Sequence, residues 1–166
     1  LSYGETERFT HGDLPGLERK LQKAQGRGMM IIVDGVYSME GDIADVPGLS
    51  AVARKHGAAL AIDDAHSLGV LGPRGDGTAA HFGMTDEVDI IAGTFSKSLA
   101  SIGGFVAARS NVVDYLRHHC RPLIFTASLP PANTAGVLAA LEVLQQEPER
   151  REHLWSITRR LQDGLR

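Results

Sequence analysis

The sequence has one cysteine, few aromatic side chains and no excess of basic residues, and each shortage excludes a class of protein. Cys120 cannot by itself form an internal disulfide or a cysteine-based metal site, which fits the reducing cytoplasm. Because 20 acidic residues outnumber 17 basic ones, the chain lacks the overall positive charge that holds a nucleic acid. No apolar run approaches the roughly 18 to 20 residues that span a bilayer, so we expect no transmembrane segment.

Glycine and apolar residues are present in proportions typical of a globular α/β enzyme domain. The 166 residues include 19 glycines, and 43% of them are hydrophobic. The sequence starts at Leu1 and stops inside a helix-like charged pattern. We therefore expect a piece of a longer chain.

Short apolar runs alternate with longer amphipathic segments, and this alternation predicts a mostly parallel sheet flanked by helices. Five apolar runs are predicted as strands, the last one weakly: 29–33, 60–62, 88–92, 105–107 and 123–125. Five amphipathic segments are predicted as helices, with Asn111 capping the third: 14–24, 46–56, 111–119, 132–146 and 150–165.

Polar segments follow three of the predicted strands: Asp34 to Ser38, Asp63 to His66 and Gly93 to Ser98. Because the carboxyl ends of parallel strands form the ligand crevice of an open sheet, we expect these segments to meet at one edge. Lys97, against the low-dielectric wall of a buried strand, is expected to offer its amine as a nucleophile. A structural lysine that pairs with a phosphate or a carboxylate would fit the same position.

Asp63 directly follows an apolar run and is expected to be buried, so it needs a cationic partner such as a protonated ring nitrogen. His66 could reach the same ligand, or could simply hydrogen-bond the aspartate. A cofactor that requires an amine nucleophile, a carboxylate for its ring nitrogen and a phosphate cradle is pyridoxal 5'-phosphate. The three polar segments match these three requirements.

Competing motifs fit less well. The P-loop pattern fails because Ser96 stands where a glycine must precede the lysine. The nicotinamide pattern G-x-G-x-x-G fails because the glycines of 75–77 are followed by Ala80 at the last glycine position. A metal site formed by Asp63, Asp64 and His66 is disfavoured because no second cluster of histidines and carboxylates has a recognisable ligand spacing.

Four ordered motifs, spread over nearly the whole chain from Phe9, resemble the α-oxoamine synthase family of fold-type I, pyridoxal-phosphate-dependent acyltransferases. They are Asp34-Gly-Val-Tyr-Ser-Met-Glu-Gly-Asp42, Ile62-Asp-Asp-Ala-His-Ser-Leu-Gly69, Gly93-Thr-Phe-Ser-Lys-Ser98 with Gly103-Gly104, and Arg121-Pro-Leu-Ile-Phe-Thr-Ala-Ser-Leu-Pro-Pro131. The motif Thr94-Phe-Ser-Lys97 is most similar to that of serine palmitoyltransferase and related long-chain enzymes, since the oxononanoate and aminolevulinate synthases more often carry glycine in place of Ser96.

The resemblance implies a role for each matching residue. Lys97 would hold the cofactor's aldehyde, Asp63 would pair with the pyridinium nitrogen, and His66 would hydrogen-bond the ring 3'-oxygen. The hydroxyls of Thr94 and Ser96 would contact the phosphate or position the lysine. The resemblance implies no metal ion.

Three more hydroxyl residues match family positions farther from the lysine. Ser38 would lie near the ring and phosphate. Thr126 and Ser128 belong to a segment that reaches the neighbouring subunit's phosphate, which implies a homodimer with a shared active site. The family's ring-stacking histidine and its substrate-binding arginine would lie outside this chain. Residues 1–166 would thus be the central part of the cofactor-binding large domain, without the N-terminal segment and C-terminal small domain, and inactive alone.

The activity implied is condensation of an amino acid (serine, glycine or alanine) with an acyl thioester carried by coenzyme A or a carrier protein, followed by decarboxylation. Within the family, 8-amino-7-oxononanoate synthase and glycine C-acetyltransferase are alternatives. Outside it, the alternative is a non-catalytic subunit that keeps the fold for dimerisation. One departure concerns Asp76, which stands between two glycines where the family often has arginine, and this puts the ion pairing of the loop in question.

Overall fold

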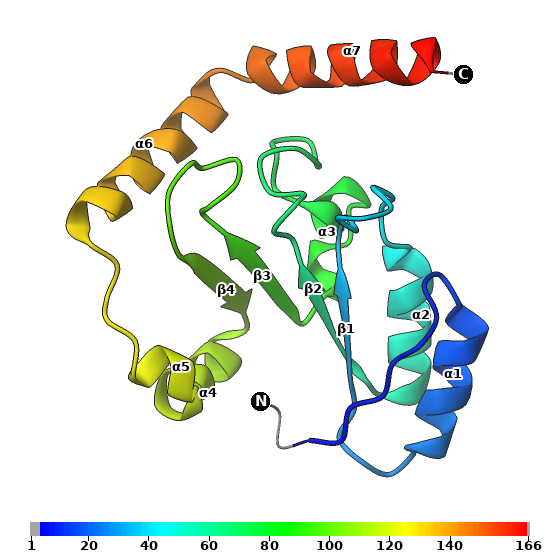
Figure 1. Ribbon diagram of the computed structural model, residues 1–166. Helices are drawn as coiled ribbons and strands as arrows, with labels where there is room; N and C mark the ends of the chain where they lie inside the picture. The colour runs from blue at the N-terminus through cyan, green and yellow to red at the C-terminus, as the bar shows by residue number, and fades with distance from the viewer. Residues whose placement is uncertain (1–3, 166) are drawn as a thin grey trace.

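The computed structural model describes residues 4–165, which contain a four-stranded sheet with helices beside it (Figure 1). The strand order is β1-β2-β3-β4, with bounds Met30–Asp34, Ala59–Asp63, Ile90–Thr94 and Gly104–Ala108. The first three strands are parallel, and β4 runs antiparallel to β3. The predicted α/β class, a mostly parallel sheet flanked by helices, is confirmed.

Helices α1 (Leu14–Lys23) and α2 (Val46–His56) cover one face of the sheet. Both begin with an aspartate cap: Asp13 accepts the N–H of Gly16, and Asp45 accepts that of Gly48. Their apolar sides pack on the strands to form the core: Leu17, Leu21, Ile31, Val33, Ala44, Val46, Leu49, Ala53, Leu60 and Ile62. Apolar burial on this face is the main stabilising term of the fold.

Between β2 and β3 the chain forms a glycine-rich loop and then two short helical turns. The loop, residues 69–77, leads into α3 (Thr78–His81), and a 3-10 turn, η1 (Thr85–Glu87), precedes β3. Positive φ angles at Gly69, Gly72, Gly75 and Gly77 show why this loop needs glycine.

The C-terminal part consists of helices that form an arc beside β4 and past the carboxyl ends of the parallel strands (Figure 1): α4 (Ser110–His119), α5 (Arg121–Ile124), α6 (Pro131–Gln146) and α7 (Glu149–Gly164). Val137 is the only buried residue in these helices. Helix α7 is attached to the glycine-rich loop, because the Trp155 indole donates to the Val70 carbonyl (3.0 Å) and Arg151 donates to the Pro73 carbonyl (2.8 Å). No helix in the described part of the chain is long and apolar enough to cross a membrane.

Most predicted elements are present, and two expectations were wrong. The run 123–125 is not a strand: residues 121–124 form α5, and Phe125, just after it, is 78% exposed. Helix α4 begins at Ser110 with Arg109 at its N-cap, so Asn111 is not the cap. The strand predicted at 105–107 is present as β4, and it runs antiparallel within the mostly parallel sheet because only nine residues, 95–103, separate it from β3. A parallel connection needs about a dozen or more residues.

Candidate active site

The carboxyl ends of β1, β2 and β3 lie at one edge of the sheet, here called the carboxyl edge. Asp34 and Asp63 are direct register partners at the ends of β1 and β2, and Asp63 is also paired with Ala92 of β3. Thr94 ends β3 and pairs with Gly104, where β4 begins. The three polar segments found in the sequence therefore start from adjacent positions.

The side chain of Asp63 lies on the face of the sheet opposite α1 and α2. Asp63 is exposed, so the expectation that it is buried was wrong; Asp64, its neighbour, is the buried aspartate. Side chains alternate along a strand, and Leu60 and Ile62 already occupy the core face of β2. Asp63 Oδ1 accepts the N–H of Ala65 at 2.9 Å, which fixes the carboxylate at the strand end.

Asp34 is a second carboxylate on the same face, and its possible role was missed from the sequence. Like charges opposite each other on neighbouring strands are destabilising. None of the ion pairs of the described residues involves Asp34 or Asp63. Burial raises the pKa of the nearby Tyr37 phenol, and the charge of Asp34 raises it further. This part of the carboxyl edge is suited to a cation.

Lys97 and His66 meet although 31 residues separate them. The Lys97 Nζ lies 2.5 Å from His66 Nε2 and 3.3 Å from Nδ1. Lys97 is exposed and His66 is half-buried. The prediction that a low-dielectric wall surrounds the Lys97 amine was therefore wrong for the described part of the chain. The other lysines, Lys20, Lys23 and Lys55, lie on α1 and α2, away from the carboxyl edge.

Hydroxyl groups hold the loop that carries Lys97. Ser98 Oγ donates to the Leu68 carbonyl at 2.6 Å, which joins this loop to the turn that carries His66. A side chain at Gly69 would overlap Ser98. This role of Ser98 was not predicted from the sequence, where its position next to a candidate nucleophile was the only signal for it.

Thr94 and Ser96 are close together at the start of the same loop. Thr94 Oγ1 lies 2.7 Å from Ser96 Oγ, accepts the N–H of Ser96 at 3.2 Å and donates to the Gly103 carbonyl at 3.1 Å. A hydroxyl has one proton and two lone pairs, so Thr94 is saturated when Ser96 is the donor of the pair. In this arrangement Thr94 shapes the loop around Lys97, and Ser96 is the residue with free acceptor capacity.

The remaining predicted site residues are not drawn into this cluster. Ser38 lies in the turn after β1, and Thr126 and Ser128 lie between α5 and α6; all three are exposed. Among the residues that the structure describes, no hydrogen bond joins any of them to Lys97, Asp63 or His66.

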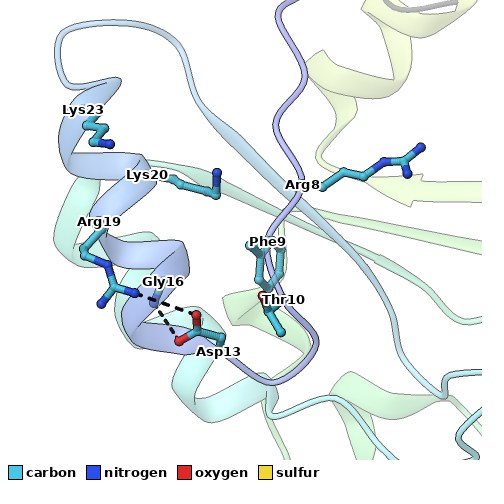
Figure 2. Close-up of a pocket in the computed structure, with 8 residues that line it drawn as sticks. All are labelled: Arg8, Phe9, Thr10, Asp13, Gly16, Arg19, Lys20 and Lys23. Atoms are coloured by element: carbon cyan, nitrogen blue, oxygen red, sulfur yellow. Dashed lines mark hydrogen bonds and ion pairs between the residues drawn. The ribbon is translucent and has the colours of Figure 1, made fainter.

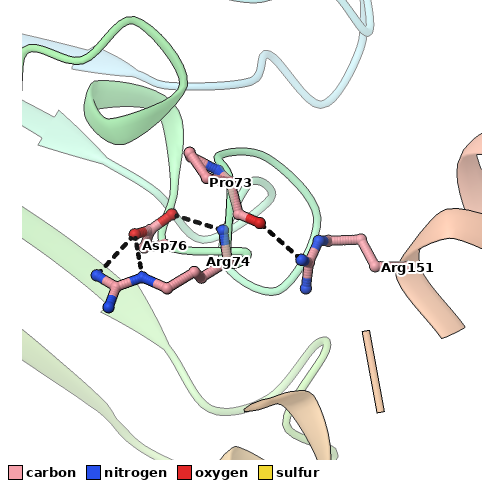
Figure 3. A network of polar contacts seen from close by, with 4 residues as sticks. All are labelled: Pro73, Arg74, Asp76 and Arg151. Carbon is pink, nitrogen blue, oxygen red and sulfur yellow. Dashed lines mark hydrogen bonds and ion pairs between the residues drawn. The ribbon is translucent and has the colours of Figure 1, made fainter. Parts of the chain in front are cut away.

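The glycine-rich loop forms its own ion pair in spite of the departure at Asp76 (Figure 3). Asp76 Oδ2 accepts from both Nε (3.3 Å) and Nη2 (3.2 Å) of Arg74, and Oδ1 accepts the Arg74 backbone N–H. Burial raises the pKa of the Asp76 carboxyl, but the contacts with Arg74 outweigh it, and the pKa lies below its ordinary value.

A hollow of about 400 Å³ lies beside α1, away from the predicted site residues (Figure 2). Two of the four cationic side chains that line it contact carboxylates: Lys20 pairs with Glu7 at 2.8 Å, and Arg19 approaches Asp13 at 3.9 Å. The chemistry of the carboxyl edge is absent there, so the carboxyl edge remains the candidate active site.

Comparison with known proteins supports the resemblance seen in the sequence. The family model described as Aminotransferase class I and II matches residues 2–166. The chain belongs to the class I and II aminotransferase family. Within that family, it is similar to serine palmitoyltransferase of Sphingobacterium spiritivorum, 50% identical over 95% of this chain and 40% of the relative. It is also similar to 8-amino-7-oxononanoate synthase of Symbiobacterium thermophilum, 42% identical over 99% of the chain and 43% of the relative.

The class I and II aminotransferase chain is also similar to solved structures. A high-resolution structure of SPT with a PLP internal aldimine has a TM-score of 0.83 and 41% identity, covering 88% of this chain and 37% of that one. The expected relation to the α-oxoamine synthases is thus confirmed. The chain spans about two fifths of the length of the curated relatives described here.

Proposed function

We propose that the full-length protein is a pyridoxal-phosphate-dependent acyltransferase that condenses an amino acid with an acyl thioester, as serine palmitoyltransferases do. The observation that carries the proposal is the meeting of the Lys97 amine with the His66 imidazole at the carboxyl edge, where Asp63 ends β2. It is supported by relatives named serine palmitoyltransferase and by the PLP in a similar solved structure.

The residues at the carboxyl edge fit pyridoxal phosphate. Two register-paired carboxylates without an ion-pair partner among the described residues suit a protonated pyridine nitrogen, and an exposed primary amine suits an aldehyde. When bound, the cofactor supplies that aldehyde and a ring that accepts electrons from the substrate's α-carbon.

Each side chain then has a defined task. Lys97 holds the cofactor through Nζ and, when an amino acid displaces it, takes the α-proton on that nitrogen. Asp63 keeps the ring nitrogen protonated, and His66 orients the ring from the neighbouring turn. Thr94 shapes the loop, while Ser96 binds the phosphate by rotating its hydroxyl so that the O–H donates to a phosphate oxygen.

The amino acid in this proposal is serine, glycine or alanine, and the acyl donor is a coenzyme A or carrier-protein thioester. Residues 1–166 form the central part of the cofactor-binding large domain, in the cytoplasm, and the remaining substrate contacts lie elsewhere in the protein. Ser38 serves the ring and phosphate. The proposal includes a homodimer with shared sites, in which Thr126 and Ser128, both exposed, reach the phosphate of the second subunit.

The test uses the full-length protein with pyridoxal phosphate. We expect a visible absorbance that borohydride removes, and a pyridoxyl group that peptide mapping finds on Lys97 and on no other lysine. Trapping elsewhere contradicts the assignment, while no trapping at all favours the non-catalytic dimerisation subunit. A series of acyl thioesters offered with each amino acid, with mass analysis of the ketone, then distinguishes the proposed activity from 8-amino-7-oxononanoate synthase and glycine C-acetyltransferase.

A further inference from the structure

Asp64 follows Asp63 in the chain, but its side chain lies on the opposite face of the sheet. Leu60 and Ile62 belong to the core on the face that α2 covers, and Asp64, the next residue in this alternation, is only 1% exposed. None of the roles given above uses this carboxylate. A buried carboxylate beside a candidate active site needs its own explanation.

The Asp64 side chain joins three segments of the chain. Its Oδ2 accepts the N–H of Thr78, the first residue of α3, at 3.1 Å. The backbones of Gly35, just after β1, and of Gly77, at the end of the glycine-rich loop, come so close that a side chain on either would overlap the carboxylate. One carboxylate therefore sets the spacing of the β1 end, the β2 end and the glycine-rich loop.

This contact is costly for the folded protein. Asp64 Oδ1 and Thr78 Oγ1 are buried and have no hydrogen-bond partner among the described residues. A buried carboxylate with one donor loses more solvation than it regains, and stability alone favours an apolar residue of similar size. Proteins accept such costs mainly at functional sites.

The backbone of Asp64 supports the residues that face Lys97. Its N–H donates to the Ala92 carbonyl at 2.7 Å, and its carbonyl accepts the N–H groups of Ser67 (3.2 Å) and Leu68 (3.0 Å). The turn that carries His66 therefore starts at Asp64, and Asp63 immediately precedes it. A shift of the Asp64 side chain would therefore move both Asp63 and the turn that carries His66.

We propose that Asp64 is a positioning residue, whose buried carboxylate holds Asp63 and His66 in the orientation in which they meet the cofactor and Lys97. The proposal rests on the proposed function for its ligand, pyridoxal phosphate. It does not place Asp64 in contact with that ligand.

The test compares three variants of the full-length protein. Asp64→Ala removes the acceptor of the Thr78 N–H. Asp64→Asn keeps the size and the acceptor, and its amide can also donate to Thr78 Oγ1. This variant should therefore retain the cofactor binding that Asp64→Ala loses. Asp89→Ala is the matched control, because Asp89 Oδ2 accepts the Leu60 N–H at 2.9 Å at the other end of β2.

Two measurements separate positioning from general stability. Titration with pyridoxal phosphate should show binding at least about tenfold weaker in Asp64→Ala, with an altered visible spectrum, and near wild type in Asp64→Asn and Asp89→Ala. Hydrogen exchange of the cofactor-free protein should rise at 65–68 and 78 in Asp64→Ala, but at the start of β2 in Asp89→Ala. If Asp64→Ala does not fold, Asp64→Ser replaces it and should show the same changes.

Two results would overturn the proposal. One is wild-type affinity and spectrum in Asp64→Ala, or in Asp64→Ser if that variant replaces it. The other is that Asp89→Ala weakens the binding of pyridoxal phosphate as much as Asp64→Ala does, at the same loss of thermal stability. If the wild-type protein does not bind pyridoxal phosphate, the proposed function fails, and the exchange pattern still decides whether Asp64 holds the turn.

Discussion

The part of the chain before position 100 and the C-terminal helices α4 to α7 differ in how they are stabilised. Among the described residues, every buried apolar side chain except Val137 lies before position 100. In the later helices large apolar side chains are exposed, among them Leu138 at 59% and Leu161 at 64%. The helices that cover the sheet, α1 and α2, begin with aspartate caps, whereas α4 to α7 have no side-chain cap.

This difference shows where the candidate site gets its precision. Asp63 and His66 extend from strands and turns fixed by the first part's core, while Lys97 lies on the loop where that part ends. The C-terminal helices contact the surroundings of the site at two places: Ser101 Oγ, on the loop that carries Lys97, donates to the Asn133 carbonyl of α6 at 3.2 Å, and α7 contacts the glycine-rich loop. Rigid elements place the chemistry, whereas the C-terminal helices leave large apolar side chains exposed in the described part of the chain.

The largest expected effect tests the core. Leu60→Ala, at a position 1% exposed, should lower the free energy of unfolding by about 2–5 kcal/mol, because it leaves a cavity between β2 and the helices. Leu161→Ala on α7 should cost less than about 0.5 kcal/mol. Urea unfolding of both variants measures the contrast. A cost for Leu161→Ala similar to that of Leu60→Ala would show that other parts of the full-length protein cover α7.

The next effect tests the helix caps. Asp45→Ala should lower the free energy of unfolding by about 1 kcal/mol, since Asp45 Oδ1 accepts the Gly48 N–H at 3.0 Å. Ser110→Ala is the control at the start of α4, where serine has the type of a cap but lies one residue inside the helix. It should change stability by less than about 0.5 kcal/mol. If thermal unfolding shows equal losses of stability in Asp45→Ala and Ser110→Ala, the difference between the capped and the uncapped helices is contradicted.

The sequence predicted the elements that local patterns determine. Apolar runs identified β1 to β4, and amphipathic periodicity identified α1, α2, α4, α6 and α7, because burial on one face imposes these patterns directly. The run 123–125 has the composition of a strand but no strand beside it, so only tertiary context decides that this region is helical and exposed.

Long-range placement was harder to predict. The chain turns put Lys97 and His66 near one edge, as expected, but which of two consecutive aspartates is buried depends on the face that α2 covers. Counting in steps of two from Leu60 and Ile62 would have assigned Asp64 to the core and Asp63 to the other face. Contacts such as Ser98 with the Leu68 carbonyl join loops with no shared sequence pattern and needed the structure.

The smallest expected effect concerns Asp76, in the loop that α7 contacts. Its pKa in the folded protein lies below the ordinary 3.8, so the carboxylate stabilises the fold at neutral pH and down to about pH 4, and this contribution is lost as the pH falls through the folded value. Asp76→Asn should therefore lower the free energy of unfolding by about 0.5 kcal/mol at pH 7, because the Arg74 partner is 84% exposed and its ion pair is weakened by solvent. Glu147→Gln, which removes an exposed partner of Arg150 near α7, is the control and should cost less. Urea unfolding from pH 7 to pH 3 should show the difference between wild type and Asp76→Asn shrinking toward acid, and a difference that grows toward acid would mean that Asp76 is stabilised in its protonated form instead.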